Sequence, residues 1–318
     1  MNPRSVIVAF VVGLSLTANF AAQAWDGTGH MLVAKVAYDR LNDKARARVE
    51  ELAAKLDNNG TQYNAVSVAC WPDDIKDRNS KSQFQGKFKQ WHYIDIGCLP
   101  KDPDVFAKLG ALSQTNGDII TALDHCVDLI RNKKTDDLVP KEEVALALLM
   151  HLVGDIHQPL HTTARYNPDP KPDDKYKDDA GGNGVTLANL GDTPWGKNLH
   201  TFWDEAYRRY FQNGEVKADA GLAEADVMTN PAVKDWLAKL DAEAPKDEKL
   251  AFEGAKTWAM ETHQIACFQV YGSLHEEYGA KNVTLTEDYV GKATKLARKQ
   301  LVLAGYRLGA LLNDLYGK

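Results

Sequence analysis

The sequence contains little cysteine and no surplus of positive charge. Only four cysteines occur in 318 residues, and none of them forms a Cys-x-x-Cys pair, which argues against a zinc site built from thiolates. Lysine and arginine number 38 against 44 aspartates and glutamates, so the net charge is −6. An acidic chain is not expected to hold phosphate backbones through a general basic surface. If such a polyanion is bound, metal cations would have to supply the local positive charge.

Long hydrophobic runs are also absent after the first 24 residues. Near the start, the apolar run VIVAFVVGLSL is followed by Ala22-Gln23-Ala24, the small-x-small pattern of a signal-peptidase site. We expect residues 1–24 to be a signal peptide and Trp25 to be the first mature residue. The run is short for a membrane-spanning helix, so an uncleaved anchor is the weaker alternative. Residues 25–318 should then be a soluble, secreted or periplasmic protein.

Helical periodicity dominates the mature chain, and no linker interrupts it. Apolar residues recur at three- and four-residue intervals in six segments: 29–41, 45–56, 118–132, 141–155, 249–275 and 286–315. Residues 91–96 and 184–190 are the only short strand candidates. The stretch 166–183 is rich in Pro, Asp, Lys and Gly and should form an exposed loop. We therefore predict an all-α fold, a single mostly helical domain over residues 25–318.

The densest chemical signal is HLVGDIHQPLH, residues 151–161. His151 and Asp155 are four residues apart in a helical run, so their side chains share one face. Pro159 should end that helix near Gln158, which lets His161 fold back toward the same site. Imidazole and carboxylate together are the usual ligands of catalytic zinc. One such pair would more often be a surface ion pair, but the sequence contains a second.

That second pair is His200 and Asp204, in NLHTFWDEAY. Asp73 in CWPDDIK and His92 in WHYIDI could join the same site, although a helix cap and a core histidine are equally good interpretations of them taken alone. His30 lies five residues after Trp25. A freed α-amine, with a pKa of ~7.7–8.0, could bind a metal together with its own carbonyl oxygen.

Taken in order, these motifs resemble the S1/P1 nuclease family of zinc-dependent nucleases. The resemblance covers most of the chain through WDGTGH, WPDDIK, WHYID, HLVGDIHQPLH, DAGGN and LHTFWDEAY. It implies a fold of the type shared by phospholipase C and nuclease P1, with three Zn²⁺ ions in one cleft. The implied ligands fall into three groups: Asp73, His92 and His151 with Asp155 bridging; His161, His200 and Asp204; and Trp25, His30 and the other oxygen of Asp155.

The resemblance also implies residues that contact substrate or take part in the reaction. Tyr93 would stack on a base and Asn183 would lie near the phosphate, with packing as the weaker alternative. Asp95 and Lys76 would be catalytic together with Asp155, with Lys76 near the scissile phosphate. The long acidic loop at 166–180 departs from the family pattern and leaves substrate specificity open.

The expected activity is endonucleolytic hydrolysis of single-stranded DNA and RNA to 5′-phosphorylated products, with 3′-nucleotides as further substrates. We expect the protein to be a monomer. A zinc-dependent phospholipase C and a non-catalytic zinc-binding protein are the alternatives. In an exported chain four cysteines suggest two disulfides, and spacing alone leaves three pairings open. The resemblance favours Cys98–Cys267, which leaves Cys70–Cys126 as the second.

Overall fold

The structure is a computed structural model that describes residues 25–98, 117–167, 178–191, 196–219, 227–242, 250–274 and 278–318. The expected signal peptide, residues 1–24, lies outside the described residues. Most of the acidic loop, residues 168–177, also lies outside them. In the described part of the chain, no helix is both long enough and apolar enough to cross a membrane.

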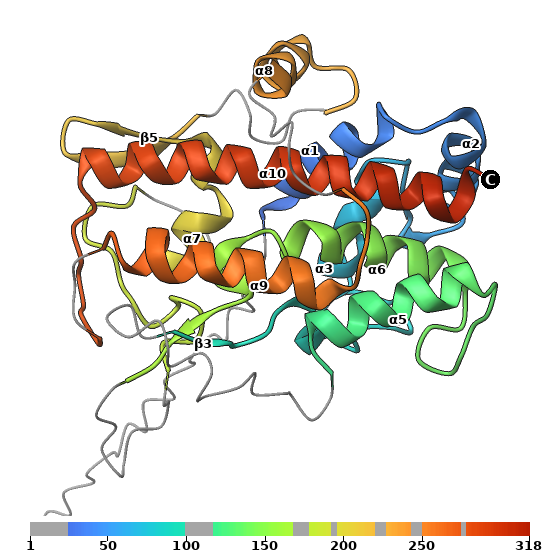
Figure 1. Ribbon diagram of the computed structural model, residues 1–318, viewed down its shortest axis with the longest axis horizontal. Helices are drawn as coiled ribbons and strands as arrows, with labels where there is room; N and C mark the ends of the chain where they lie inside the picture. The colour runs from blue at the N-terminus through green and yellow to red at the C-terminus, as the bar shows by residue number, and fades with distance from the viewer. Residues whose placement is uncertain are drawn as a thin grey trace, which may run out of the picture.

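Helices form most of the described chain, which confirms the all-α prediction (Figure 1). The α-helices are α1 (Gly27–Tyr38), α2 (Asp43–Ala53), α3 (Trp71–Asp74), α5 (Ile119–Arg131), α6 (Glu142–Asp155), α7 (Leu199–Asp204), α8 (Pro231–Ala242), α9 (Ala255–Ile265) and α10 (Glu287–Tyr316). Short 3₁₀ turns are η1 (Ser67–Cys70), η2 (Lys89–His92), η4 (Pro159–His161) and η5 (Ala206–Arg208). The π-helix η7 (Ala266–Tyr271) continues α9 directly.

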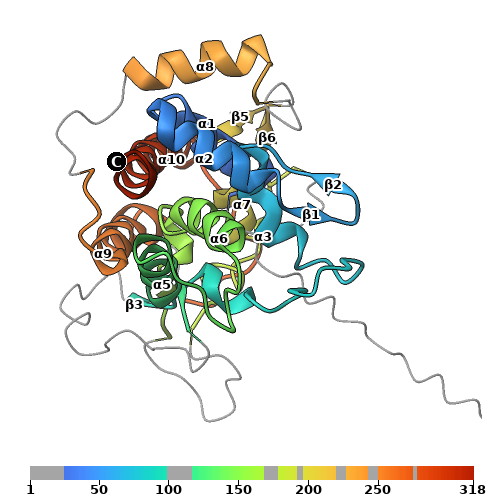
Figure 2. The ribbon, with the colours of Figure 1, turned by 90° about the vertical axis from the view of Figure 1, so that its right-hand side faces the viewer.

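Helix α6 lies at the centre of the molecule. Every residue from Val144 to Asp155 is buried, as expected for a helix that is apolar on nearly all sides. Figure 2 shows it end-on, with α1 and α2 above it, α5 and α9 to one side and α3 to the other. Because His151 and Asp155 belong to this helix, their polar side chains are held inside the core.

Helix α10 is the longest element and packs along α1. The two helices approach closely at Gly305, where an added Cβ would lie 2.4 Å from Val36 Cβ. Thr286 caps the start of α10, since its side chain accepts a hydrogen bond from the Tyr289 backbone N–H. This packing fixes α1, and with it the segment that carries His30.

The described strands form three small two-stranded sheets. β1 (Asp57–Asn58) pairs with β2 (Thr61–Gln62), and β5 (Arg209–Gln212) pairs with β6 (Glu215–Ala218), both antiparallel. β3 (Gly97–Cys98) runs parallel to β4 (Ala164–Arg165).

Neither of the two short strand candidates forms a regular strand. Residues 91–96 begin in the turn η2, and the Ile94 N–H donates to the carbonyl of His161, 2.8 Å away, instead of to a neighbouring strand. Residues 184–190 form only isolated bridges, at Thr186, Leu187 and Leu190. Single contacts with three different segments replace a regular ladder here.

One predicted disulfide is confirmed and the other is wrong. Cys98 and Cys267 are bonded, with their Cα atoms 5.7 Å apart, and they tie β3 to η7. Cys70 and Cys126 are free. Cys70 ends η1 with its thiol 3.3 Å from the carbonyl oxygen of Gly27, whereas Cys126 is buried within α5. The two thiols therefore belong to different packing environments, and the expected Cys70–Cys126 bond does not form.

Candidate metal centre

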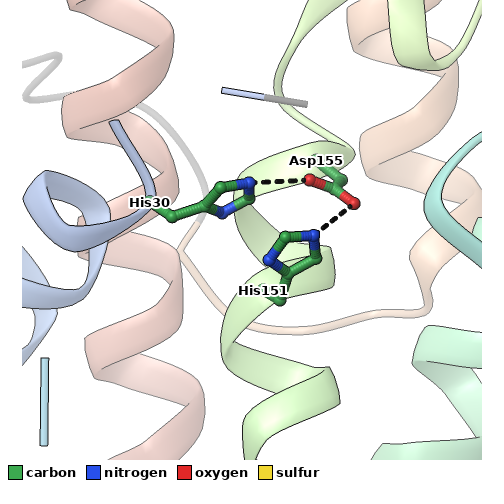
Figure 3. Close-up of side chains that lie close together, drawn as sticks. All are labelled: His30, His151 and Asp155. Atoms are coloured by element: carbon green, nitrogen blue, oxygen red, sulfur yellow. Dashed lines mark ion pairs between the residues drawn. The ribbon is translucent and has the colours of Figure 1, made fainter. Parts of the chain in front are cut away.

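The end of α6 presents Asp155 to three imidazoles. Asp155 Oδ1 lies 3.2 Å from His30 Nε2, and Oδ2 lies 3.0 Å from His92 Nδ1 and 3.2 Å from His151 Nε2. Figure 3 shows His30 and His151 on the two oxygens of this carboxylate. The rings of His30 and His151 are stacked with centroids 3.8 Å apart. The two oxygens of this buried carboxylate thus face different rings: Oδ1 faces His30, and Oδ2 faces His92 and His151.

A first group of possible ligands consists of Asp73, His92 and His151. The ligand atoms converge: His151 Nε2 lies 2.8 Å from His92 Nδ1 and 3.6 Å from Asp73 Oδ1. Lys76 Nζ lies 2.5 Å from the same Asp73 oxygen. Asp73 stands in the short helix α3, so η2, α3 and α6 all contribute to this group.

A second group consists of His161, His200 and Asp204. His161 Nε2 and His200 Nε2 are 3.1 Å apart, and His200 Nε2 is 3.7 Å from Asp204 Oδ1. The predicted break after α6 produces this arrangement. Gln158 accepts a hydrogen bond from the Leu160 N–H and donates one to Asp204, while Pro159 begins the turn that carries His161.

Three of the histidines are oriented by backbone carbonyls. The Nδ1 of His151 donates to the Ala69 carbonyl, that of His161 to the His92 carbonyl and that of His200 to the Gly181 carbonyl. Each of these distances is 2.7 Å. A proton on Nδ1 leaves Nε2 with a lone pair, directed into the group. The Gly-Gly-Asn turn, in which Gly181 and Gly182 have positive φ, therefore holds one ring of the second group.

Several buried polar atoms around Asp155 make no hydrogen bond of good geometry with the described residues, although Asp73 Oδ1 is ion-paired with Lys76 and Asp155 Oδ1 lies close to His30 Nε2. They are both ring nitrogens of His30, Nε2 of His92 and the Oδ1 atoms of Asp73 and Asp155. Leaving such groups unsatisfied in a core costs about 1–3 kcal/mol each. Each of three sets of side chains offers ligand atoms that all lie within 4.8 Å of one another: His30, His151 and Asp155; Asp73, His92 and His151; and His161, His200 and Asp204. Nitrogen and carboxylate donors arranged in this way fit divalent cations of the zinc type.

The protonation tendencies of His92 and Asp155 agree with a ligand role. Burial lowers the pKa of His92 to about 3, and the Lys76 charge adds to this effect, so the ring is neutral at working pH. Burial alone would raise the pKa of Asp155, but the neighbouring imidazoles, His151 first, hold it well below its usual range. Asp204 differs, because burial raises its pKa well above the ordinary value. A cation near Asp204 would favour its ionised form.

The Trp25 segment is inserted between α6 and α7. Trp25 is fully buried, and its indole N–H donates to the Gly154 carbonyl at 2.9 Å. The backbone N–H of Asp26 donates to the carbonyl of Asp204 at 3.2 Å. A Cβ on Gly154 would approach His30 Nδ1 to 2.9 Å, so glycine makes room for that ring. The segment Trp25–Asp26 thus contacts Gly154, the residue before Asp155, and Asp204 of the second group.

The residues predicted to contact substrate have mixed surroundings. Tyr93 is half-buried and directly follows His92, and Lys76 lies beside Asp73. Asp95 is also half-buried; burial, with the charges of Asp178 and Asp179, raises its pKa to about 7. Asn183 donates its side-chain amide to the Ala180 carbonyl within the glycine turn.

Sequence reasoning did not identify the residues that hold the Trp25 segment. Asp26 caps α1 through the Gly29 N–H at 2.8 Å and accepts from the Tyr207 hydroxyl at 2.8 Å, while Arg208 lies 2.9 Å from its other oxygen. Aspartate immediately before a helical segment is a recognisable N-cap signal. Tyr207 and Arg208 carry no such signal, because only the folded chain brings them to Asp26.

Histidines without a predicted role lie elsewhere. His157 is fully buried between the Val153 carbonyl and Arg307. His263 contacts Thr163 and the disulfide sulfur of Cys267, and His125 pairs with Asp136. His275 lies outside the described residues.

Comparisons with known proteins agree with this geometry. The family model described as S1/P1 Nuclease matches residues 25–317. The chain is similar to Nuclease S1 of Aspergillus oryzae, with 26% identity over 301 residues that cover 91% of each chain. It is also similar to Endonuclease 4 of Arabidopsis thaliana, with 24% identity over 93% of this chain and 90% of the relative. Nuclease P1 of Penicillium citrinum is 23% identical over 92% of this chain and 98% of its own length.

Proposed function

The chain belongs to the S1/P1 nuclease family, and on this premise we propose that it is an exported, zinc-dependent endonuclease. Its substrates are single-stranded DNA and RNA, which it cleaves to 5′-phosphorylated products, and it also removes the phosphate from 3′-nucleotides. The observation that carries the proposal is the convergence of the three sets of buried imidazole and carboxylate ligands at the end of α6.

The described residues would hold three Zn²⁺ ions. Asp73, His92 and His151 would bind the first and His161, His200 and Asp204 the second. The third would take His30 and the amine and carbonyl of Trp25, with Asp155 shared between the first and third. When bound, zinc supplies an activated water near neutral pH and stabilises negative charge on phosphoryl oxygens.

The protein's own groups prepare this chemistry. The carbonyls of Ala69, His92 and Gly181 keep the proton of each imidazole on Nδ1, so Nε2 remains available as a ligand. Gln158 donates to Asp204 Oδ1 and fixes the orientation of that carboxylate. These contacts fix the ligands before substrate arrives, which reduces the reorganisation needed during the reaction.

Substrate recognition would involve a smaller set of side chains. The Tyr93 ring would stack on an unpaired base, which gives single-strand preference without reading sequence. The Lys76 ammonium would approach a phosphate oxygen, and Asn183 would contact the same phosphate. Asp95, with its pKa raised to about 7, can hold or release a proton near the base.

The test is a substrate panel with purified mature protein. Single-stranded DNA, RNA, 3′-AMP and phosphatidylcholine should be compared with and without chelator. We expect the nucleic acids and 3′-AMP to be hydrolysed only without chelator, and the lipid to stay intact. Lipid turnover without nucleotide release would favour the phospholipase C alternative, and bound zinc without any turnover would favour a zinc-binding protein. Family membership supports the nuclease over both alternatives.

A further inference from the structure

A groove away from the metal centre runs between α10 and η7. It consists of two adjoining cavities of about 560 and 340 Å³, which share Gln269 and Lys299 in their walls. Trp203 and Tyr289 form part of the wall of the larger cavity, and the Trp203 indole donates to the Tyr289 hydroxyl at 3.1 Å. Trp203 directly precedes Asp204 of the second ligand group, so α7 separates the groove from the metal centre.

The groove concentrates positive charge on an acidic protein. Lys292, Lys295, Arg298 and Lys299 line the larger cavity, and no acidic residue occurs between Asp288 and Asp314 in the sequence of α10. Glu261 lines the smaller cavity, where its carboxylate lies 2.6 Å from Arg307. The three lysines are exposed. Lys292 Nζ lies 2.7 Å from Asp288, but both side chains are more than 70% exposed, so this pair competes weakly with a polyanion.

An exposed aromatic ring borders the same groove. Phe268 lines the smaller cavity and is 55% exposed, which is unusual for a phenylalanine. It lies in the π-helix η7, a helical irregularity that is common at functional sites. A row of cations beside an accessible aromatic ring is the combination by which proteins bind single strands without sequence preference.

We propose that this groove binds the single-stranded polynucleotide substrate at a distance from the cleavage site. The phosphates lie along Lys292, Lys295 and Lys299, and one base stacks on Phe268. This proposal rests on the proposed nuclease function, whose substrate carries a phosphate at every nucleotide. A strand of many nucleotides could occupy the groove and the metal centre together, whereas a dinucleotide could occupy only one of them.

The experiment compares the wild type with the triple variant Lys292→Gln, Lys295→Gln and Lys299→Gln, in which glutamine preserves helix propensity. The kcat/KM for a long single strand and for a dinucleotide is measured at several salt concentrations. We expect the long-strand value to fall about ten-fold or more at low salt and the dinucleotide value to remain unchanged. The slope of log kcat/KM against log salt for the long strand should become shallower by about 2, from three phosphate contacts at 0.7 each.

Two controls separate this effect from general charge and folding effects. Exposed lysines outside the groove are neutralised in Lys44→Gln, Lys134→Gln and Lys256→Gln, which changes the net charge equally. Phe268→Ala should weaken binding of the long strand roughly five-fold or more, and Phe268→Tyr should restore it, because tyrosine keeps the ring.

A direct binding measurement makes the result independent of turnover. Fluorescence anisotropy with a cleavage-resistant phosphorothioate strand should show weaker binding by the groove variant than by the control variant. Equal binding by both variants overturns the groove proposal, even where dinucleotide hydrolysis upholds the nuclease function. If the wild type cleaves no nucleic acid but its strand binding depends on the groove lysines, the nuclease function fails and the groove proposal stands.

Discussion

At the residue scale, one carboxylate and one chain segment connect the ligand groups. Asp155 faces His30 with one oxygen and His92 and His151 with the other. Trp25 lies against Gly154, one residue before Asp155. A small displacement of either residue should therefore alter more than one ligand group.

If the α-amine of Trp25 binds the third zinc, as proposed above, extending the mature chain by one glycine before Trp25 should remove that ion. The added residue converts the α-amine into an amide, which cannot bind a metal in the same way. We expect the zinc content to fall from three to two ions per chain, and kcat/KM to fall on the order of a hundred-fold or more. Elemental analysis and turnover of single-stranded DNA measure both effects. The matched control carries the glycine after Lys318; three zincs in the extended protein would contradict the prediction.

Acid sensitivity should depend on His263. Burial lowers its pKa to about 4, below the ordinary 6.5, so the folded protein disfavours the charged ring. Between pH 6.5 and 4 the unfolded chain binds a proton that the folded chain does not, and folding stability falls as the pH drops. Urea unfolding of His263→Gln should lose less stability over this window than the wild type. Parallel pH profiles for the two proteins would refute the assignment.

At the scale of helices, the contact between α1 and α10 requires a residue without a side chain. Gly305→Ala would place its Cβ 2.4 Å from Val36, and overpacking of this kind typically costs about 1–3 kcal/mol. Gly291→Ala is the matched control in the same helix, because nothing lies within 4 Å of the new atom. It should stabilise α10 by up to about 1 kcal/mol. Chemical denaturation distinguishes the two, and equal effects would show that packing at Gly305 is not the cause.

The long helices were predictable because their apolar residues repeat over three or more turns. The hairpin of β5 and β6 was not identified, although Asn213-Gly214 between its strands is a strong turn signal. Residues 91–96 were assigned wrongly, since their alternating pattern places side chains around a turn and beside His161 instead of in a sheet.

The candidate site, like the long helices, was predictable where the signal lies in local sequence spacing. His151 and Asp155 were predictable from spacing within one helix, and the structure brings together the dispersed histidines and aspartates whose motifs carried the family resemblance. The contacts of Asp26 with Tyr207 and Arg208, about 180 residues away, could not be predicted from local sequence. Pairing by elimination failed for Cys70 and Cys126, because an even number of cysteines does not require every thiol to be bonded.

At the scale of the whole molecule, bound metal should contribute strongly to stability. The ligands come from α1, α3, α6, α7, η2 and η4, so the ions would join segments from both halves of the chain. A ligand that binds only the folded state stabilises it, by about 4 kcal/mol at a thousand times its dissociation constant. We expect chelator to lower the melting temperature by more than 10 °C and added zinc to restore it. An unchanged melting temperature after verified metal removal would contradict this linkage.

The burial of Trp25 decides how the protein can be attached to anything else. Its side chain is fully enclosed, whereas Lys318 is exposed at the end of α10, where Figure 1 marks the C-terminus. Affinity tags, fluorophores and bead linkers should therefore be fused behind Lys318. Under the proposed function, in which the α-amine of Trp25 binds zinc, a handle in front of Trp25 would leave the protein inert until a protease removed every residue of the handle.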